Sequence, residues 1–262
     1  MTLPPPPPSN TSATKVNSDE RELLLYTVNV NKFLNNRFQE VQEFLDATQA
    51  VMQTSTYKNN NRFRNDKAFK GQKMVMRTLQ RLKDLNLKEV LKRFSDLIPL
   101  AVDIKNPNRD LYLPMDSVLH YWLCNIKQAF DLSERLLGLC EHTVKYLLAR
   151  IRLGHFWNWA VFSYANISRI WTLSQTMMLY LHLGYDVYKQ LLECLPKSEV
   201  QWLPETIQIE NELLHPDSQL REKETMKKLF LNNDFPVGKS ELNSTNSLGA
   251  CIGEIVETSS RT

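Results

Sequence analysis

Apolar side chains recur at helical spacing over most of this chain, and polar or proline-containing stretches separate the helical segments. Ser18 and the two acids after it place an N-cap and negative charge where the dipole of a first helix favours both. The apolar spacing continues to about Leu45 and fades by Thr54, so we predict a helix over this range. The polar residues at 57–62 predict a loop or frayed turn.

Further helical patterns follow, and residues that commonly stop a helix separate them. Prolines bracket a predicted loop at 99–114, and Gly154 and Pro196 end the last two patterns. We therefore predict helices at 67–97 with a possible break near Asn86, at 116–153, and at 155–195.

The segment at 155–195 is apolar on nearly all sides, which is typical of a helix inside a bundle. Its most apolar part, 155–185, contains one charge, Arg169. The longest uncharged run without histidine, 156–168, is shorter than the ~20 apolar residues that a membrane span needs. We therefore predict a buried helix and no membrane contact.

Composition agrees with an all-α fold, because seven glycines in 262 residues are few for glycine-rich sheet architectures. The prediction is a helical bundle with two long central antiparallel helices at 116–195 and a basic amphipathic helix. Residues 1–18 are expected to form a disordered lead rich in Pro, Ser and Thr, and 232–262 a disordered acidic and polar tail. The helical domain then covers 19–231, with a short amphipathic helix plausible at 217–233.

Positive charge is concentrated in one region of the chain. Residues 57–93 contain twelve Lys or Arg and three Asp or Glu, a net charge of +9, so the rest of a chain that totals +3 carries −6. Such asymmetry is typical of a protein that binds a polyanion.

Some of these basic residues are spaced so that they share one face of a predicted helix and form a stripe. Four basic residues are spaced by three, four and four positions and share one face of a helix: Lys70, Lys73, Arg77 and Arg81. Four apolar residues take roughly the opposite face: Ala68, Val75, Leu79 and Leu82. We favour a row of phosphate contacts over the alternative, the solvated face of an ordinary amphipathic helix.

The loop before this helix adds groups that could read RNA. Its asparagines can donate and accept hydrogen bonds, and Phe63 could offer a ring on which a base stacks. An Asn-rich turn that caps a helix is an equally good interpretation. The RNA-binding candidates are Asn59, Asn61, Arg62, Arg64, Lys67, Lys70, Lys73, Arg77 and Arg81.

No catalytic residue, metal site, cofactor or small-molecule substrate is predicted. His120 and Cys124 share a helix face, but no second pair has compatible spacing, so core packing is the better interpretation. Arg169, with Trp171 close by, is a structural or groove residue. A buried Arg169 would need an acid such as Glu134 or Glu141, and the alternative is that it binds RNA in a groove.

Three stretches in order over 57–195 resemble the nucleolus and neural progenitor protein family. Tyr57-Lys58-Asn59-Asn60-Asn61-Arg62 through Lys67 resembles a Tyr-x-Asn-His-x-Arg…Lys motif. Residues 79–87, LQRLKDLNL, resemble a basic helix ending in a Leu-Lys-x-x-Asn-Leu phrase. The third stretch, 139–191, includes Lys145-Tyr146-Leu147 and also Ser168-Arg169-Ile170-Trp171, which is similar to the family's Ser-Arg-Leu-Trp.

The resemblance implies an N-terminal helical domain similar to a fungal protein subunit of the RNase MRP ribonucleoprotein, which processes ribosomal RNA. It implies a nuclear, nucleolar protein whose partners are structured non-coding RNA and ribonucleoprotein subunits. It also implies a role in early embryogenesis and in neural progenitor maintenance downstream of Notch. The alternative is a nuclear adaptor without direct RNA contact.

Two departures from the family pattern matter. Asn60 stands where the family has histidine, which puts any role of an imidazole there in doubt. The family's long basic C-terminal extension has no counterpart in these residues, so a fragment and a short isoform are both open interpretations.

Overall fold

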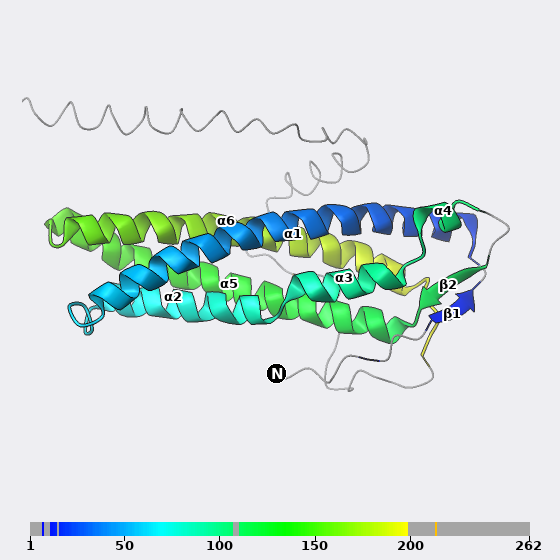
Figure 1. Cartoon of the computed structure of the whole chain (residues 1–262), viewed down its shortest axis with the longest axis horizontal. Coiled ribbons are helices and arrows are strands. Elements are labelled where there is room, and N and C mark those ends of the chain that lie inside the picture. The colour runs from blue at the N-terminus through cyan, green and yellow to red at the C-terminus, as the bar shows by residue number, and fades with distance from the viewer. Residues whose placement is uncertain (1–6, 8–10, 15, 107–109, 199–212, 214–262) are drawn as a thin grey trace, which may run out of the picture. The chain divides into compact units, whose positions relative to one another are not determined.

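The computed structural model describes residues 7, 11–14, 16–106, 110–198 and 213. The fold is all-α, as predicted, with one short antiparallel pair of strands added. The described elements in chain order are β1 (Thr11–Thr14), α1 (Ser18–Asn59), α2 (Lys67–Asp84), α3 (Leu87–Leu97), α4 (Ala101–Ile104), β2 (Leu111–Pro114), α5 (Asp116–Leu153) and α6 (Trp157–Leu192) (Figure 1).

The predicted central pair of long helices is confirmed. α5 and α6 pack along each other, α2 packs on α5, and α1 packs on α6 (Figure 1). Gly154 ends α5 with φ +69°, a left-handed conformation that glycine adopts without steric cost, so the chain reverses directly into α6. At the far end of α6 the Tyr188 hydroxyl donates to Asn31 Oδ1 and joins this helix to α1.

The break predicted near Asn86 is confirmed, and the end predicted for α1 is wrong. Asn86 has φ +46° and separates α2 from α3. α1 continues through the Ser and Thr residues at 54–56 to Asn59. Gln72 Nε2 donates to Thr56 Oγ1 at 3.0 Å, and Met52 is fully buried, so tertiary packing outweighs weak local helix propensity.

The predicted disorder of residues 1–18 is wrong at Thr11–Thr14. These residues form β1, which pairs antiparallel with β2, Thr11 lying opposite Pro114. β2 buries Leu111 and Leu113 and exposes Tyr112, a half-buried strand whose backbone needs a partner. The predicted loop at 99–114 therefore contains both α4 and β2. The predicted tail at 232–262, the end of the predicted domain at 231 and the helix at 217–233 lie outside the described residues.

The prediction that α6 is surrounded by neighbours holds for only half of the helix. From Met177 to Leu191 almost every position is buried or half-buried. Before that, one face is buried and the other is open, with Trp157 54% and Phe162 39% exposed. None of the helices in the described ranges combines the length and the apolar composition that crossing a bilayer requires.

Candidate nucleic-acid interface

One face of α2 is fixed against the bundle, as the spacing predicted. Ala68, Val75, Leu79 and Leu82 are all buried. α2 approaches α5 closely at Gly71, where an added Cβ would clash with Thr143 Oγ1. Because Gly71 has no side chain, the α2 backbone packs directly against the Thr143 side chain of α5, and the opposite face of α2 points away from α5.

The opposite face of α2 presents cations to solvent. Lys70, Arg77 and Arg81 are exposed, and their side chains form no ion pair with any described residue. Arg62, Arg64 and Lys67 are also exposed and continue the charge toward the start of the helix. We call the row Lys67, Lys70, Lys73, Arg77 and Arg81 the basic stripe. The structure therefore keeps the stripe open to an outside polyanion.

Lys73 differs from Lys70, Arg77 and Arg81 because its side chain already has partners. Its Nζ donates to Asn60 Oδ1 at 2.6 Å and lies 4.8 Å from the centre of the Phe69 ring. Lys67 Nζ lies 5.8 Å from the centre of the Tyr146 ring on α5. Lys73 thus ties the α1–α2 loop to α2, and its charge is less available than that of Lys70 or Arg77.

The sequence left open whether the asparagines of the loop between α1 and α2 contact RNA or cap a helix. Asn59 Nδ2 donates to the Ser55 carbonyl at 2.9 Å, so Asn59 closes the last turn of α1. The Asn59 side chain is therefore bonded within its own helix, the residue that caps α2 is Asp66, and Asn61 is exposed to solvent.

Phe63 does not offer a ring to a base, and that prediction is wrong. Its side chain is only 4% exposed and stacks on Trp159 with ring centres 4.4 Å apart and an interplanar angle of 28°. The apolar ring folds inward and anchors the loop to α6. Phe156 lies against its edge with ring centres 5.0 Å apart.

An ion pair between Asp66 and Arg150 locks the start of α2 onto α5, and sequence analysis missed it. Asp66 caps α2 by accepting from the Phe69 amide at 2.8 Å, and its other oxygen pairs with the Arg150 guanidinium. That guanidinium lies 5.5 Å and 5.7 Å from the ring centres of Phe63 and Trp159. The cap has a local sequence signal, an Asp just before a helical pattern, but the partner is 84 residues away and has none.

Arg169 is exposed and forms no ion pair with any described residue, so the predicted pairing with Glu134 or Glu141 is wrong. Its guanidinium lies 5.4 Å from the centre of the Phe44 ring on α1. Glu141, one of the two proposed partners, instead accepts a hydrogen bond from Trp171 Nε1 at 3.3 Å, which makes Trp171 a link between α5 and α6. Arg169 lies on the seam between α1 and α6 and is separate from the basic stripe.

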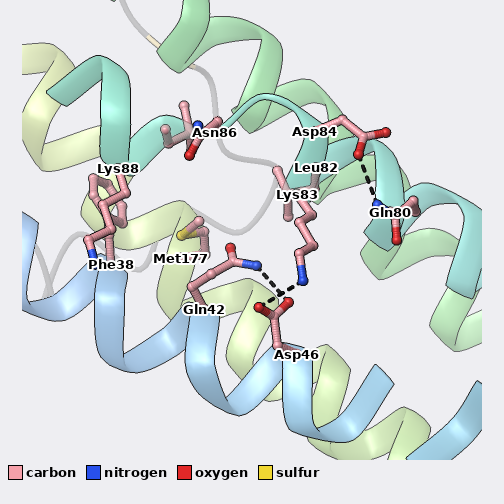
Figure 2. Close-up of a pocket in the computed structure, with 11 residues that line it drawn as sticks. Phe38, Gln42, Asp46, Gln80, Leu82, Lys83, Asp84, Asn86, Lys88 and Met177 are labelled. Atoms are coloured by element: carbon pink, nitrogen blue, oxygen red, sulfur yellow. Dashed lines mark hydrogen bonds and ion pairs between the residues drawn. The ribbon is translucent and has the colours of Figure 1, made fainter. Parts of the chain in front are cut away.

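A cavity of about 470 Å³ lies where α1 meets the break between α2 and α3 (Figure 2). Two lysines and two aspartates line it with three amide side chains over an apolar floor. Lys83 pairs with Asp46 at 3.0 Å, Gln42 donates to Asp46 at 3.0 Å, and Gln80 donates to Asp84 at 2.8 Å (Figure 2). The five side chains in these contacts satisfy one another, whereas Lys88 lines the cavity without an ion pair to any described residue.

The pair His120 and Cys124 belongs to the core. Burial lowers the pKa of His120, against an opposing effect of Asp116, and burial raises the pKa of Cys124. Across the described ranges there is no group of three His, Cys, Asp or Glu side chains placed to hold a metal ion.

One family model matches most of the chain. It is described as the N-terminal region of nucleolus and neural progenitor protein, and it covers residues 1–192, a range that includes the basic stripe and α1 to α6. No curated protein and no solved structure matches the chain.

Proposed function

The chain belongs to the nucleolus and neural progenitor protein family, and from this premise we propose that it is a non-enzymatic RNA-associated protein of the nucleus and nucleolus. Its helical bundle holds the basic stripe as a rigid surface, and that surface grips the phosphate backbone of RNA. The family name supports the nucleolar assignment and a role in neural progenitors.

The observation that carries this proposal is that three cations of the stripe are exposed and have no side-chain partner among the described residues. Lys70, Arg77 and Arg81 have no ion pair among the described residues, whereas Lys83, on another face of the same helix, pairs with Asp46. From Lys70 to Arg81 the helix rises about 16 Å, enough to meet several phosphates of one strand. An arginine can engage each phosphate with two parallel hydrogen bonds.

The resemblance to a fungal RNase MRP subunit supports a narrower assignment. We propose that the RNA is a structured non-coding RNA of an RNase MRP or P type particle, and that this chain assembles there with other protein subunits in ribosomal RNA processing. The developmental role downstream of Notch is proposed on the same resemblance. Crosslinking in cells, followed by sequencing of the bound RNA, tests this assignment, and recovery of unrelated messenger RNAs would contradict it.

Charge reversal at the stripe tests RNA binding itself. The double variant Arg77→Glu and Arg81→Glu should weaken binding while leaving helicity unchanged. Each lost phosphate contact should also flatten the slope of log affinity against log salt by about 0.7–0.9. The matched control is Lys32→Glu with Lys105→Glu, two exposed lysines outside the stripe with the same change in charge. An unchanged slope in the first variant would remove these arginines from the interface.

A second function, a nuclear adaptor that binds an acidic protein partner without RNA, has one observation in its favour. Phe44 and Val51 on α1 and Phe162 on α6 are apolar and at least 39% exposed, as protein interfaces often require. Competition with heparin separates the two functions, because affinity for RNA no better than for heparin favours the adaptor. Metal-dependent RNA cleavage by the purified chain would contradict both.

A further inference from the structure

Exposed aromatic and basic side chains gather at one end of the bundle, where the loop at 59–66 and the turn at 153–157 meet. We call this end the tip; it lies opposite the β1–β2 pair (Figure 1). We propose that the tip binds an unpaired nucleotide of single-stranded RNA, whose base stacks on Trp157 and on the Arg62–Phe156 pair. This inference rests on the proposed function and assigns a base-binding site next to the stripe.

The tip presents stacking surfaces to solvent. The Arg62 guanidinium lies 4.2 Å from the centre of the Phe156 ring, and Phe156 remains 45% exposed. Trp157, the next residue, is 54% exposed. Arginine planes and aromatic rings are the groups on which proteins stack unpaired bases, because every base has a π face.

Contacts with Phe63 and Arg62 hold Phe156 in a strained backbone conformation. Phe156 has φ +51° and ψ +42°, a left-handed conformation that is rare and costly for a bulky side chain. Beneath it, Phe63 packs against the Phe156 ring with centres 5.0 Å apart and is itself stacked on Trp159. The platform is therefore set before a ligand arrives, which reduces the ordering cost of binding.

Charge favours RNA over an apolar peptide as the occupant. The segments 57–66 and 149–158 contain five Lys or Arg and a single carboxylate. That carboxylate is Asp66, which is paired with Arg150. Arg64 and Lys67, both exposed, lie between Arg62 and Lys70 in the sequence, so they add positive charge between the tip and the rest of the stripe.

The test compares a short single-stranded RNA with a blunt RNA duplex of the same length. Trp157→Ala should bind the single strand about tenfold more weakly and the duplex unchanged, and its salt slope should match that of the unmodified protein. Trp157→Phe should restore the affinity, because a phenyl ring still stacks. The matched control is Tyr112→Ala, an exposed aromatic on β2 at the other end.

A second variant separates stacking from folding. Phe156→Gly removes the ring, and glycine accepts the left-handed backbone, so weaker binding of the single strand without unfolding supports the site. If the tip variants lose equal affinity for the two RNAs, or lose none, the proposal is overturned. It is also overturned if a protein binds at the tip and the tip variants bind RNA as tightly as before. If the Arg77 and Arg81 reversals weaken the binding of both RNAs while the tip variants weaken the binding of neither, only the proposal for the tip is contradicted. If those reversals change nothing, the proposed function fails.

Discussion

The two faces of α2 differ in burial and in contacts. Toward α5 and α6 the helix is filled with fixed contacts: Phe69 is fully buried and Gly71 touches Thr143. Toward solvent it presents basic side chains, three of which, Lys70, Arg77 and Arg81, have no side-chain partner of any kind among the described residues. Stability should therefore depend on one face and RNA binding on the other.

The largest expected effect comes from Phe69 on the buried face. Phe69→Ala should lower the free energy of unfolding by about 3–5 kcal/mol, because it removes a buried ring that packs near Phe63 and Trp159. The adjacent Lys70→Ala should change it by less than about 0.5 kcal/mol. Urea titration followed by circular dichroism measures both, and similar losses would break the contrast between the faces.

Replacing Asp66 should cause the second-largest loss in the free energy of unfolding, because Asp66 caps α2 and pairs with Arg150. Asp66→Ala should cost about 2 kcal/mol, combining loss of the cap with a partly buried guanidinium left without its partner. Asp66→Asn keeps a capping oxygen and should recover part of the loss. The same unfolding titration compares the two, and an alanine variant as stable as the asparagine variant would contradict the role of the cap.

The close approach at Gly71 predicts a smaller effect that depends on Thr143. Gly71→Ala should lose about 1 kcal/mol, because the clash with Thr143 Oγ1 outweighs the helix propensity gained. In the Thr143→Ala background the same change should cost less, and a double-mutant cycle measures that coupling. Additive effects would mean that the helices adjust without strain.

Replacing Lys73 should have the smallest of these effects on the free energy of unfolding. The comparison with Lys70 tests whether partnered and unpartnered lysines of the stripe differ. Lys73→Met should lose roughly 0.5–1 kcal/mol, because it removes the hydrogen bond to Asn60 and the contact with the Phe69 ring. Lys70→Met, at an unpartnered position, should leave stability unchanged. Thermal unfolding of the two variants side by side makes the comparison, and equal melting temperatures would show that the contacts of Lys73 contribute nothing.

Local patterns in the sequence predict most of the bundle. Helical periodicity, Gly154 and the break near Asn86 place the long helices, because these signals act over a few residues. They could not predict β1, whose pairing with β2 spans about a hundred residues. They also missed the last turn of α1, which tertiary contacts hold.

At the candidate site, too, local sequence patterns predict less where contacts between distant segments decide the structure. The exposure of the stripe follows from helix phase, so Lys70, Arg77 and Arg81 could be placed from sequence. The inward ring of Phe63 and the stacking of Arg169 on Phe44 depend on partners from other helices. Helix phase predicts which face is open but not which aromatic ring the tertiary fold leaves exposed.

Lysine footprinting tests most directly whether RNA lies on the outer face of α2. The free protein and the RNA-bound protein are acetylated briefly, and mass spectrometry gives the modification of each lysine. Bound RNA should protect Lys67 and Lys70, while Lys32 and Lys105, exposed elsewhere, should react as in the free protein. Unprotected Lys67 and Lys70 in a saturated complex, or protection confined to Lys32 and Lys105, would contradict the account.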